Sequence, residues 1–403
     1  MSRLRILLGL ALAMAVLAAA VPAGASADVN PNCKGRANAD ELGGWTGYAK
    51  YCFPIVALPS PAPARYAHLA ERGIAAASRW HHRRWYCEFL HCTHGPYPYA
   101  TIWGSIGLLE AADALETGKP SAGHLRQLNR VAGEFEKLFW DPARGGFAPY
   151  PYDSAGNTRT FFDDNGWIGL GFYNAYAATG NTRWLHDAQK AARFVLAHGW
   201  DSSTGGIWWE TYHSFKSGPA LASNALLVTL LYNADHEEWQ LQTALKYVEW
   251  GNTVDNSDER RYYRNNPDGG VTLDMVQSPM IYAQYLLCQD GQGEEYCERA
   301  GRLATTLSEQ IYDANGYRYN YAPQYDAIFL QWMMVYGHAV GVEYWLQLAE
   351  VNAGEAAKHA VNRSGEYLKS WWGRPFEGLK IGGLMRTDVA TASLFAWVSV
   401  YAK

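Results

Sequence analysis

Two aspartates, Asp163 and Asp164, stand side by side where a long polar loop meets an apolar segment. Aromatic residues flank the pair, with Phe161 and Phe162 before it and Trp167 after it. A single aspartate at such a junction is a favoured helix N-cap, but a second one places a like charge in a partly desolvated position. Hydrolysis of a glycosidic bond uses two carboxyl groups, one as acid/base and one as nucleophile or base. The pair therefore predicts a glycosidase, with plain helix capping as the alternative.

The adjacency of the two aspartates also predicts the stereochemistry of the reaction. Retaining glycosidases hold their carboxyl groups roughly 5–5.5 Å apart, and neighbouring residues at a loop–helix junction can reach that spacing. A helix N-terminus favours the ionised form of one carboxyl group. The charge of this neighbour and the aromatic surroundings keep a proton on the other. We therefore expect one nucleophile and one acid, acting without a metal ion or cofactor.

Two kinds of helical segment alternate along the chain and must position this pair. One kind is apolar on nearly every side, as a helix buried on every side should be, and it occupies 99–115, 166–178, 220–232, 275–288, 327–346 and 390–402. The other kind is amphipathic, with apolar residues at three- and four-residue spacing, and it occupies 64–80, 121–140, 182–199, 235–251, 293–312 and 350–372.

This alternation predicts an all-α fold, an (α/α)6 barrel of six helix hairpins with apolar helices inside and amphipathic helices outside. An open solenoid also alternates but needs polar caps at its ends, and this sequence finishes on an apolar segment. No low-complexity linker interrupts residues 61–403. We therefore expect one catalytic domain there, after an N-terminal extension at 28–60.

The connections between the segments are unequal in length. Those from an apolar to an amphipathic segment are short, as at 179–181, whereas those in the other direction are long and aromatic, as at 140–162 and 200–218. In a ring of hairpins the long loops all emerge at one end, and loops on a rigid scaffold tend to carry function. The acidic pair lies at this end, where the inner helices begin.

The stretch FFDDNGWIGLGFYNAYAATGN at 161–181, followed by GWDSSTGGIWWE at 199–210, resembles glycoside hydrolase family 76, the endo-α-1,6-mannanases. The likeness is close over about 160–232, where Lys216 and Asn224 match a further family element, and looser over 270–345. It implies an (α/α)6 barrel, in agreement with the independent pattern of helices. It also implies that Asp163 is the nucleophile and Asp164 the acid/base.

The resemblance further implies which residues contact the sugar, and here the chain departs from the family. Glu210 stands where Asn is usual, Asp326 stands where Lys is usual, and only Gln277 remains of a Tyr-Asn-Gln-Gly element. We expect such departures to alter the choice of substrate more than the chemistry. The predicted substrate-binding residues are Phe162, Trp167, Trp208, Trp209, Glu210, Lys216, Gln277 and Asp326.

The composition fits a protein that handles sugars. The chain has 17 Trp and 27 Tyr beside 13 Phe, and Trp and Tyr combine a broad apolar face with a polar tip. Its formal net charge of −5 at pH 7 gives no support to nucleic-acid binding, which requires a basic face. We expect the partner to be a polysaccharide or oligosaccharide, and the protein to be a monomer.

Residues 1–27 predict a secretory signal peptide, with a basic start at Arg3 and Arg5, an apolar core and the small-residue sequence ASA at 25–27. An uncleaved membrane anchor is the alternative. No other stretch is apolar for long enough to span a bilayer. We therefore expect a secreted protein without a membrane span.

The six cysteines predict disulfides, because an even number in an exported chain favours pairing. Spacing suggests three local pairs but leaves the connectivity open. Zinc is the alternative for the second pair, which lies near four histidines. The suggested pairs are Cys33 with Cys52, Cys87 with Cys92, and Cys288 with Cys297.

Together these features predict a secreted retaining enzyme that cleaves internal α-1,6-mannosidic linkages of mannan. A transglycosylase acting on α-mannan or a cell-wall glycan is an alternative, because the sequence does not separate water from sugar as the acceptor. A non-catalytic carbohydrate-binding protein on the same barrel is another.

Overall fold

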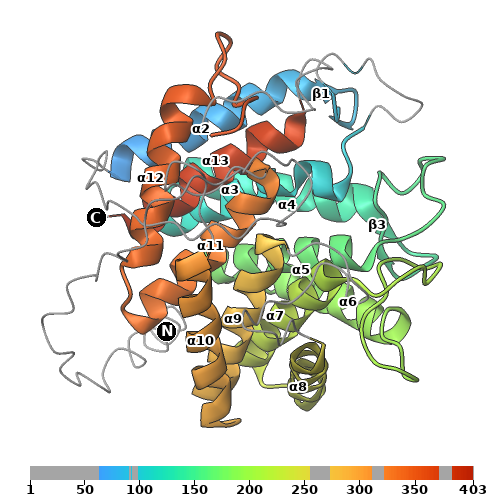
Figure 1. Ribbon diagram of the computed structural model, residues 1–403. Coiled ribbons are helices and arrows are strands. Elements are labelled where there is room, and N and C mark those ends of the chain that lie inside the picture. Colours follow the sequence, from blue (N-terminus) through green and yellow to red (C-terminus); the bar gives the residue numbers. More distant parts are fainter. Residues whose placement is uncertain are drawn as a thin grey trace, which may run out of the picture.

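The computed structural model describes residues 63–89, 92, 99–254, 273–310, 322–371 and 384–402. In these residues the chain forms twelve α-helices, a short 3-10 helix and two small antiparallel strand pairs (Figure 1). None of the described helices combines the length and the apolar character needed to cross a membrane. The predicted signal peptide and N-terminal extension lie outside the described residues.

The helices form two concentric layers. The inner layer consists of α3 (Ile102–Gly118), α5 (Phe162–Thr179), α7 (Gly218–Asp235), α9 (Asp274–Gln289), α11 (Pro323–Val340) and α13 (Met385–Tyr401). The outer layer consists of α2 (Pro63–Ala77), α4 (Ala122–Phe139), α6 (Thr182–His198), α8 (Glu238–Thr253), α10 (Glu294–Gln310) and α12 (Tyr344–His359). The short elements are η1 (Ser78–Trp80), β1 (His81–His82) paired with β2 (Trp85–Tyr86), and β3 (Trp140–Asp141) paired with β4 (Gly146–Phe147).

The inner helices close into a ring. Each packs against the next, from α3 through α5, α7, α9 and α11 to α13, and α13 packs in turn against α3. Figure 1 shows α13 beside α2 and α3, which lie at the other end of the described chain. Each outer helix covers the inner layer, as α6 covers α5 and α7. The predicted (α/α)6 barrel is confirmed.

The two layers differ in burial as their sequences predict. Residues 218–231 of the inner helix α7 are all buried, because the helix is covered by α5, α8 and α9. The outer helix α4 buries only one face, through Leu128, Val131, Phe135 and Phe139, at three- and four-residue spacing. Burying each such side chain stabilises the fold by about 1.5–3 kcal/mol.

The predicted apolar segment 327–346 is wrong at its end. Helix α11 stops at Val340, because Gly341 adopts a left-handed conformation with a φ of 73°. Residues 344–346 open the outer helix α12, which ends at His359 rather than near residue 372. An amphipathic helix that opens on apolar residues looks like the end of an apolar one, because periodicity alone does not separate the two.

Two of the three predicted disulfides are confirmed. Cys87 is bonded to Cys92, so these two cysteines serve each other rather than a zinc ion. The second bond ties Cys288 at the end of α9 to Cys297 in α10. Cys33 and Cys52 lie outside the described residues, and their pairing stays a prediction.

Candidate active site

A cavity of about 530 Å³ opens at the end of the barrel where the inner helices begin. Five inner helices contribute residues from the first turn or the position just before it, so several partly positive helix ends face the cavity. Its lining in the described part of the chain is Thr101, Trp103, Pro149, Tyr150, Gly156, Thr158, Arg159, Phe161, Asp163, Asp164, Trp209, Phe215, Ser217, Pro219, Leu273, Met275 and Tyr325.

The acidic pair lies in the first turn of α5. The N-cap residue is Phe161, whose side chain makes no capping bond. The Oδ1 of Asp163 accepts the backbone N–H of Asp164 at 3.0 Å, and its Oδ2 accepts the indole N–H of Trp209 at 3.2 Å. Among the described residues no hydrogen bond reaches the carboxyl group of Asp164. The two carboxyl groups therefore have different surroundings, and capping accounts for neither of them in full.

These surroundings separate the protonation states of the pair. Burial raises the pKa of both carboxyl groups above the usual range of aspartate. The hydrogen bonds from Asp164 and Trp209 oppose that rise in the pKa of Asp163, since they stabilise its charged form. The charge of Asp163 raises the pKa of Asp164 further. Asp163 is thus the first of the two to ionise, and Asp164 keeps its proton to higher pH.

Hydrogen bonds from three directions fix the start of α5. The side chain of Asn165 accepts the N–H of Phe147 at 2.8 Å and donates to the carbonyl of Phe161 at 2.8 Å. The amide of Asn224 on α7 donates to the carbonyl of Phe162 at 2.9 Å. The backbone N–H of Phe162 donates to Trp209 at 2.9 Å. The turn that carries the aspartates is therefore held by two loops and a neighbouring helix.

Three of the predicted site residues, Asp163, Asp164 and Trp209, line the cavity together. The others do not line it in the described structure. Six of these are buried: Phe162, Trp167, Gln277 and Asp326 on the inner helices, and Glu210 and Lys216 in the loop between α6 and α7. Trp208 and Lys216 belong to the same loop.

Glu210 and Lys216 stabilise the α6–α7 loop (residues 199–217). The carboxylate of Glu210 accepts the N–H of Tyr212 at 2.5 Å and that of Ser214 at 3.2 Å. The Nζ of Lys216 lies 2.6 Å from a carboxylate oxygen of Asp201 and 3.5 Å from the centre of a ring of Trp208. Direct contact of these side chains with a sugar remains a prediction.

Sequence reasoning missed most of the aromatic lining. Trp103, Tyr150, Phe161, Phe215 and Tyr325 all face the cavity. Trp103 and Tyr325 also contact each other, with ring centres 5.5 Å apart. The available signal was position, because each of these residues lies in a long loop or at the start of an inner helix.

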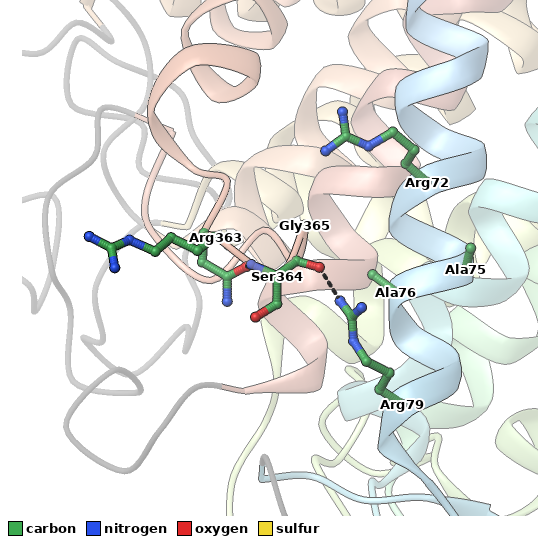
Figure 2. A pocket seen from close by; sticks show the side chains of 8 residues that line it. Arg72, Ala75, Ala76, Arg79, Arg363, Ser364 and Gly365 are labelled. Carbon is green, nitrogen blue, oxygen red and sulfur yellow. Dashed lines mark hydrogen bonds between the residues drawn. The ribbon is translucent and has the colours of Figure 1, made fainter.

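A second cavity, of about 390 Å³, lies between α2 and the segment after α12 (Figure 2). Its lining is basic, with Arg72, Arg79 and Arg363, and among the described residues it includes no carboxyl group. Figure 2 shows Arg79 donating to the carbonyl of Ser364, at 2.6 Å, and Arg79 also binds Glu366 at 2.8 Å. This cavity cannot supply two acids, so the first cavity is the candidate active site.

A closed helical barrel whose mouth holds two unlike carboxyl groups among aromatic side chains has the features of a glycoside hydrolase. The model of glycosyl hydrolase family 76 matches residues 143–386, and the chain belongs to this family. The resemblance inferred from the sequence is confirmed. Comparison with curated proteins found no match.

Solved structures share the fold. A family 76 α-mannanase of Bacteroides thetaiotaomicron has a TM-score of 0.72 at 20% identity, covering 83% of this chain and 96% of that one. An α-1,6-mannanase of Salegentibacter sp. has a TM-score of 0.67 at 15% identity, with 83% and 99% covered. That structure is of an inactive variant, with two consecutive aspartates replaced by alanine, in complex with α-1,6-mannotetrose. The cellobiose 2-epimerase of Bacillus thermoamylovorans has a TM-score of 0.62 at 11% identity, with 83% and 99% covered.

Proposed function

We propose that this chain is a secreted, retaining glycoside hydrolase that cleaves internal α-1,6-mannosidic linkages of mannan. Asp163 is the nucleophile and Asp164 the acid/base. The observation that carries the proposal is the unequal hydrogen bonding of the adjacent pair, with two donors to Asp163 and none to Asp164 among the described residues. The Salegentibacter structure supports it, because two consecutive aspartates were replaced in that inactive mannanase.

The proposed reaction proceeds in two displacements. In the first, the proton of Asp164 passes to the glycosidic oxygen as its bond to the anomeric carbon breaks, and a carboxylate oxygen of Asp163 bonds to that carbon. In the second, Asp164 takes a proton from water while the water oxygen displaces Asp163. The proton returns to Asp164 and the charge to Asp163, and the anomeric configuration is retained.

The cavity lining supports a neutral saccharide as substrate. Its aromatic faces suit the apolar faces of sugar rings. Arg159 is the one cationic residue among the described lining residues, whereas an acidic polysaccharide would favour a more basic cleft. The signal peptide predicted from the sequence and the two disulfides support secretion.

The test is incubation of the protein with linear α-1,6-, α-1,2- and α-1,3-linked mannans, with products sized over time. We expect shortening of the α-1,6 chain alone, with intermediate lengths first, as internal cleavage requires. Proton NMR within minutes should show the α anomer of the new reducing end. An initial β anomer would exclude retention, and products longer than the substrate would indicate transglycosylation.

The Asp163→Asn variant is the control, because the amide preserves the shape of the side chain and one of its two hydrogen-bond acceptors but cannot attack. If this variant cleaves mannan as the wild type does, the alternative that the two aspartates only cap the helix would hold. If neither protein cleaves any mannan but both bind it, the non-catalytic alternative holds.

A further inference from the structure

The indole of Trp209 is the only side-chain donor that reaches either aspartate among the hydrogen bonds of the described residues. Its Nε1 lies 3.2 Å from Oδ2 of Asp163. The other oxygen of Asp163 is bonded to the backbone of Asp164 at 3.0 Å. A hydrogen bond to an ionised carboxylate is roughly twice as strong as one between neutral groups, so the indole favours the charged form of Asp163.

The indole is fixed before any substrate arrives. The ring of Trp209 stacks on Phe215, at a centre-to-centre distance of 5.0 Å, and also contacts Phe161, at 4.9 Å. Its backbone N–H donates to Phe215 at 2.9 Å, and its carbonyl accepts the N–H of Phe162 at 2.9 Å. Two rings and two backbone bonds therefore hold the N–H in line with Asp163.

The α6–α7 loop is itself anchored to the residues just before α5. The N–H of Thr211 donates to the carbonyl of Thr160 at 3.1 Å, and Phe161 pairs with Glu210 as an isolated bridge. The buried carboxylate of Glu210 closes the turn that follows. The loop and the nucleophile helix thus form one unit, joined at the reacting group by a single indole.

We propose that Trp209 is a positioning residue, and that its indole N–H sets the orientation and charge of Asp163 and so decides which aspartate attacks. This inference rests on the proposed function. The bond also bears on the second displacement, because Asp163 regains its negative charge when it leaves the anomeric carbon, and the indole stabilises that charge. A role as a sugar-stacking platform would need only the ring and not its N–H.

Other titratable groups line the cavity around Asp163 from several elements. Asp164 lies on the same helix as Asp163. Tyr325 lies on α11, and the negative charge of Asp163 contributes to the raised pKa of its hydroxyl. Tyr150 and Arg159 reach the cavity from the loop before α5. The lining residues from α3, α7 and α9 are uncharged: Thr101, Trp103, Ser217, Pro219, Leu273 and Met275. None of these groups is altered by the substitution that follows.

The experiment is the pH profile of kcat/KM for Trp209→Phe, which keeps an aromatic ring but removes the N–H. We expect the acid limb, which reports ionisation of Asp163, to move up by about one pH unit, a tenfold change in that equilibrium. The matched control is Trp250→Phe, which removes an indole bond to Thr204 of the same loop, at 3.1 Å, and should leave the limb in place. An unmoved limb in a folded Trp209→Phe protein would overturn the proposal.

A second measurement needs neither substrate nor a folded variant at position 209. In wild-type protein labelled with ¹⁵N-tryptophan, one indole N–H resonance should shift as Asp163 titrates, and this shift should vanish in Asp163→Asn. The absence of any such resonance would contradict the inference. Because the readout is independent of turnover, a protein that shows the shift but cleaves no mannan would count against the proposed function alone.

Discussion

Gly166 of α5 and Ser223 of α7 approach so closely that a Cβ added to Gly166 would lie 2.0 Å from Oγ of Ser223. The hydroxyl cannot easily move away, because it donates to the carbonyl of Pro219 at 2.8 Å. This contact lies within one turn of the acidic pair. The position of the pair against α7 therefore depends on the absence of one methyl group.

Gly166→Ala should push α5 away from α7 and displace both aspartates. We expect a loss of about 1–3 kcal/mol in the free energy of unfolding, typical of overpacking, with a fall in kcat larger than the change in KM. Thermal denaturation and mannan kinetics measure both. Gly133→Ala on α4 is the control, because its Cβ would meet only Trp184, at 3.9 Å. Equal behaviour of the two variants would show that the close contact is unimportant.

The pH dependence of activity should be bell-shaped, with both limbs above the ordinary aspartate range. Burial raises the pKa of Asp163, so activity should appear only as the pH rises through that value. The pKa of Asp164 is raised further, and activity should fall as this acid loses its proton. Profiles of kcat/KM between pH 4 and 9 on an α-1,6-mannooligosaccharide provide the measurement. A limb near pH 3.9, the value of a free aspartate, would contradict the effect of burial on Asp163.

Asp164→Asn should affect substrates according to their leaving groups. Loss of the acid should slow release of a mannose hydroxyl by about 10²–10⁴-fold, and should affect release of an activated aryl alcohol far less. Added azide should restore turnover in Asp164→Ala by attacking the glycosyl-enzyme without a base. Asp163→Asn should gain nothing from azide by this route. Azide rescue of the wrong variant would reverse the assignment of the two roles.

Asp388 on α13 should make folding stability depend on pH. Burial raises its pKa to about 8, although it accepts the N–H of Tyr367 at 2.7 Å. Its contribution to stability is fully present below about pH 3.9, the unfolded value, and is lost as the pH rises through about 8. Asp388→Asn keeps the acceptor and should raise the free energy of unfolding by about 1–3 kcal/mol at pH 8, with little change at pH 4. The control is Asp153→Asn at an exposed residue whose pKa is lowered beside Arg84. This variant should show no rise in the free energy of unfolding at pH 8.

The cysteines should form three disulfides in the secreted protein. Intact mass should rise by six hydrogens on reduction, and thiol labelling under denaturing conditions should find nothing before reduction. Cys33 and Cys52 decide the outcome, since the other four are bonded in pairs. Two labelled cysteines before reduction would show that the first pair is not formed.

The fold could be predicted because burial in a two-layer barrel leaves a periodic trace. Residues 218–231 of α7 are buried on every side, and α4 has a single buried face. The turn at Gly341 was not predicted, because α12 opens on apolar residues that continue the sequence pattern of α11. No local sequence pattern indicates the contact between α13 and α3 that closes the ring. It was predicted only because six helix hairpins are the number in an (α/α)6 barrel.

The candidate site was predictable in its acids and much less in its walls. Asp163 and Asp164 stand out as adjacent like charges, whereas Trp103 and Tyr325 look like other aromatic residues until the barrel brings them together. Glu210 and Lys216 were predicted to contact the sugar because they occupy positions that the family resemblance covers. Their partners are backbone amides and Asp201, which only the folded loop places beside them.

The contact of α13 with α2 and α3 also constrains how the protein is made. The barrel wall stays open until α13 is available, since it fills the gap between α11 and α3. During synthesis the apolar faces of α2 and α3 stay unburied by α13 until nearly the whole barrel has been translated. Incomplete chains therefore expose apolar surface that is prone to aggregation. A premature stop before residue 385 would thus yield an aggregating fragment rather than a smaller working enzyme.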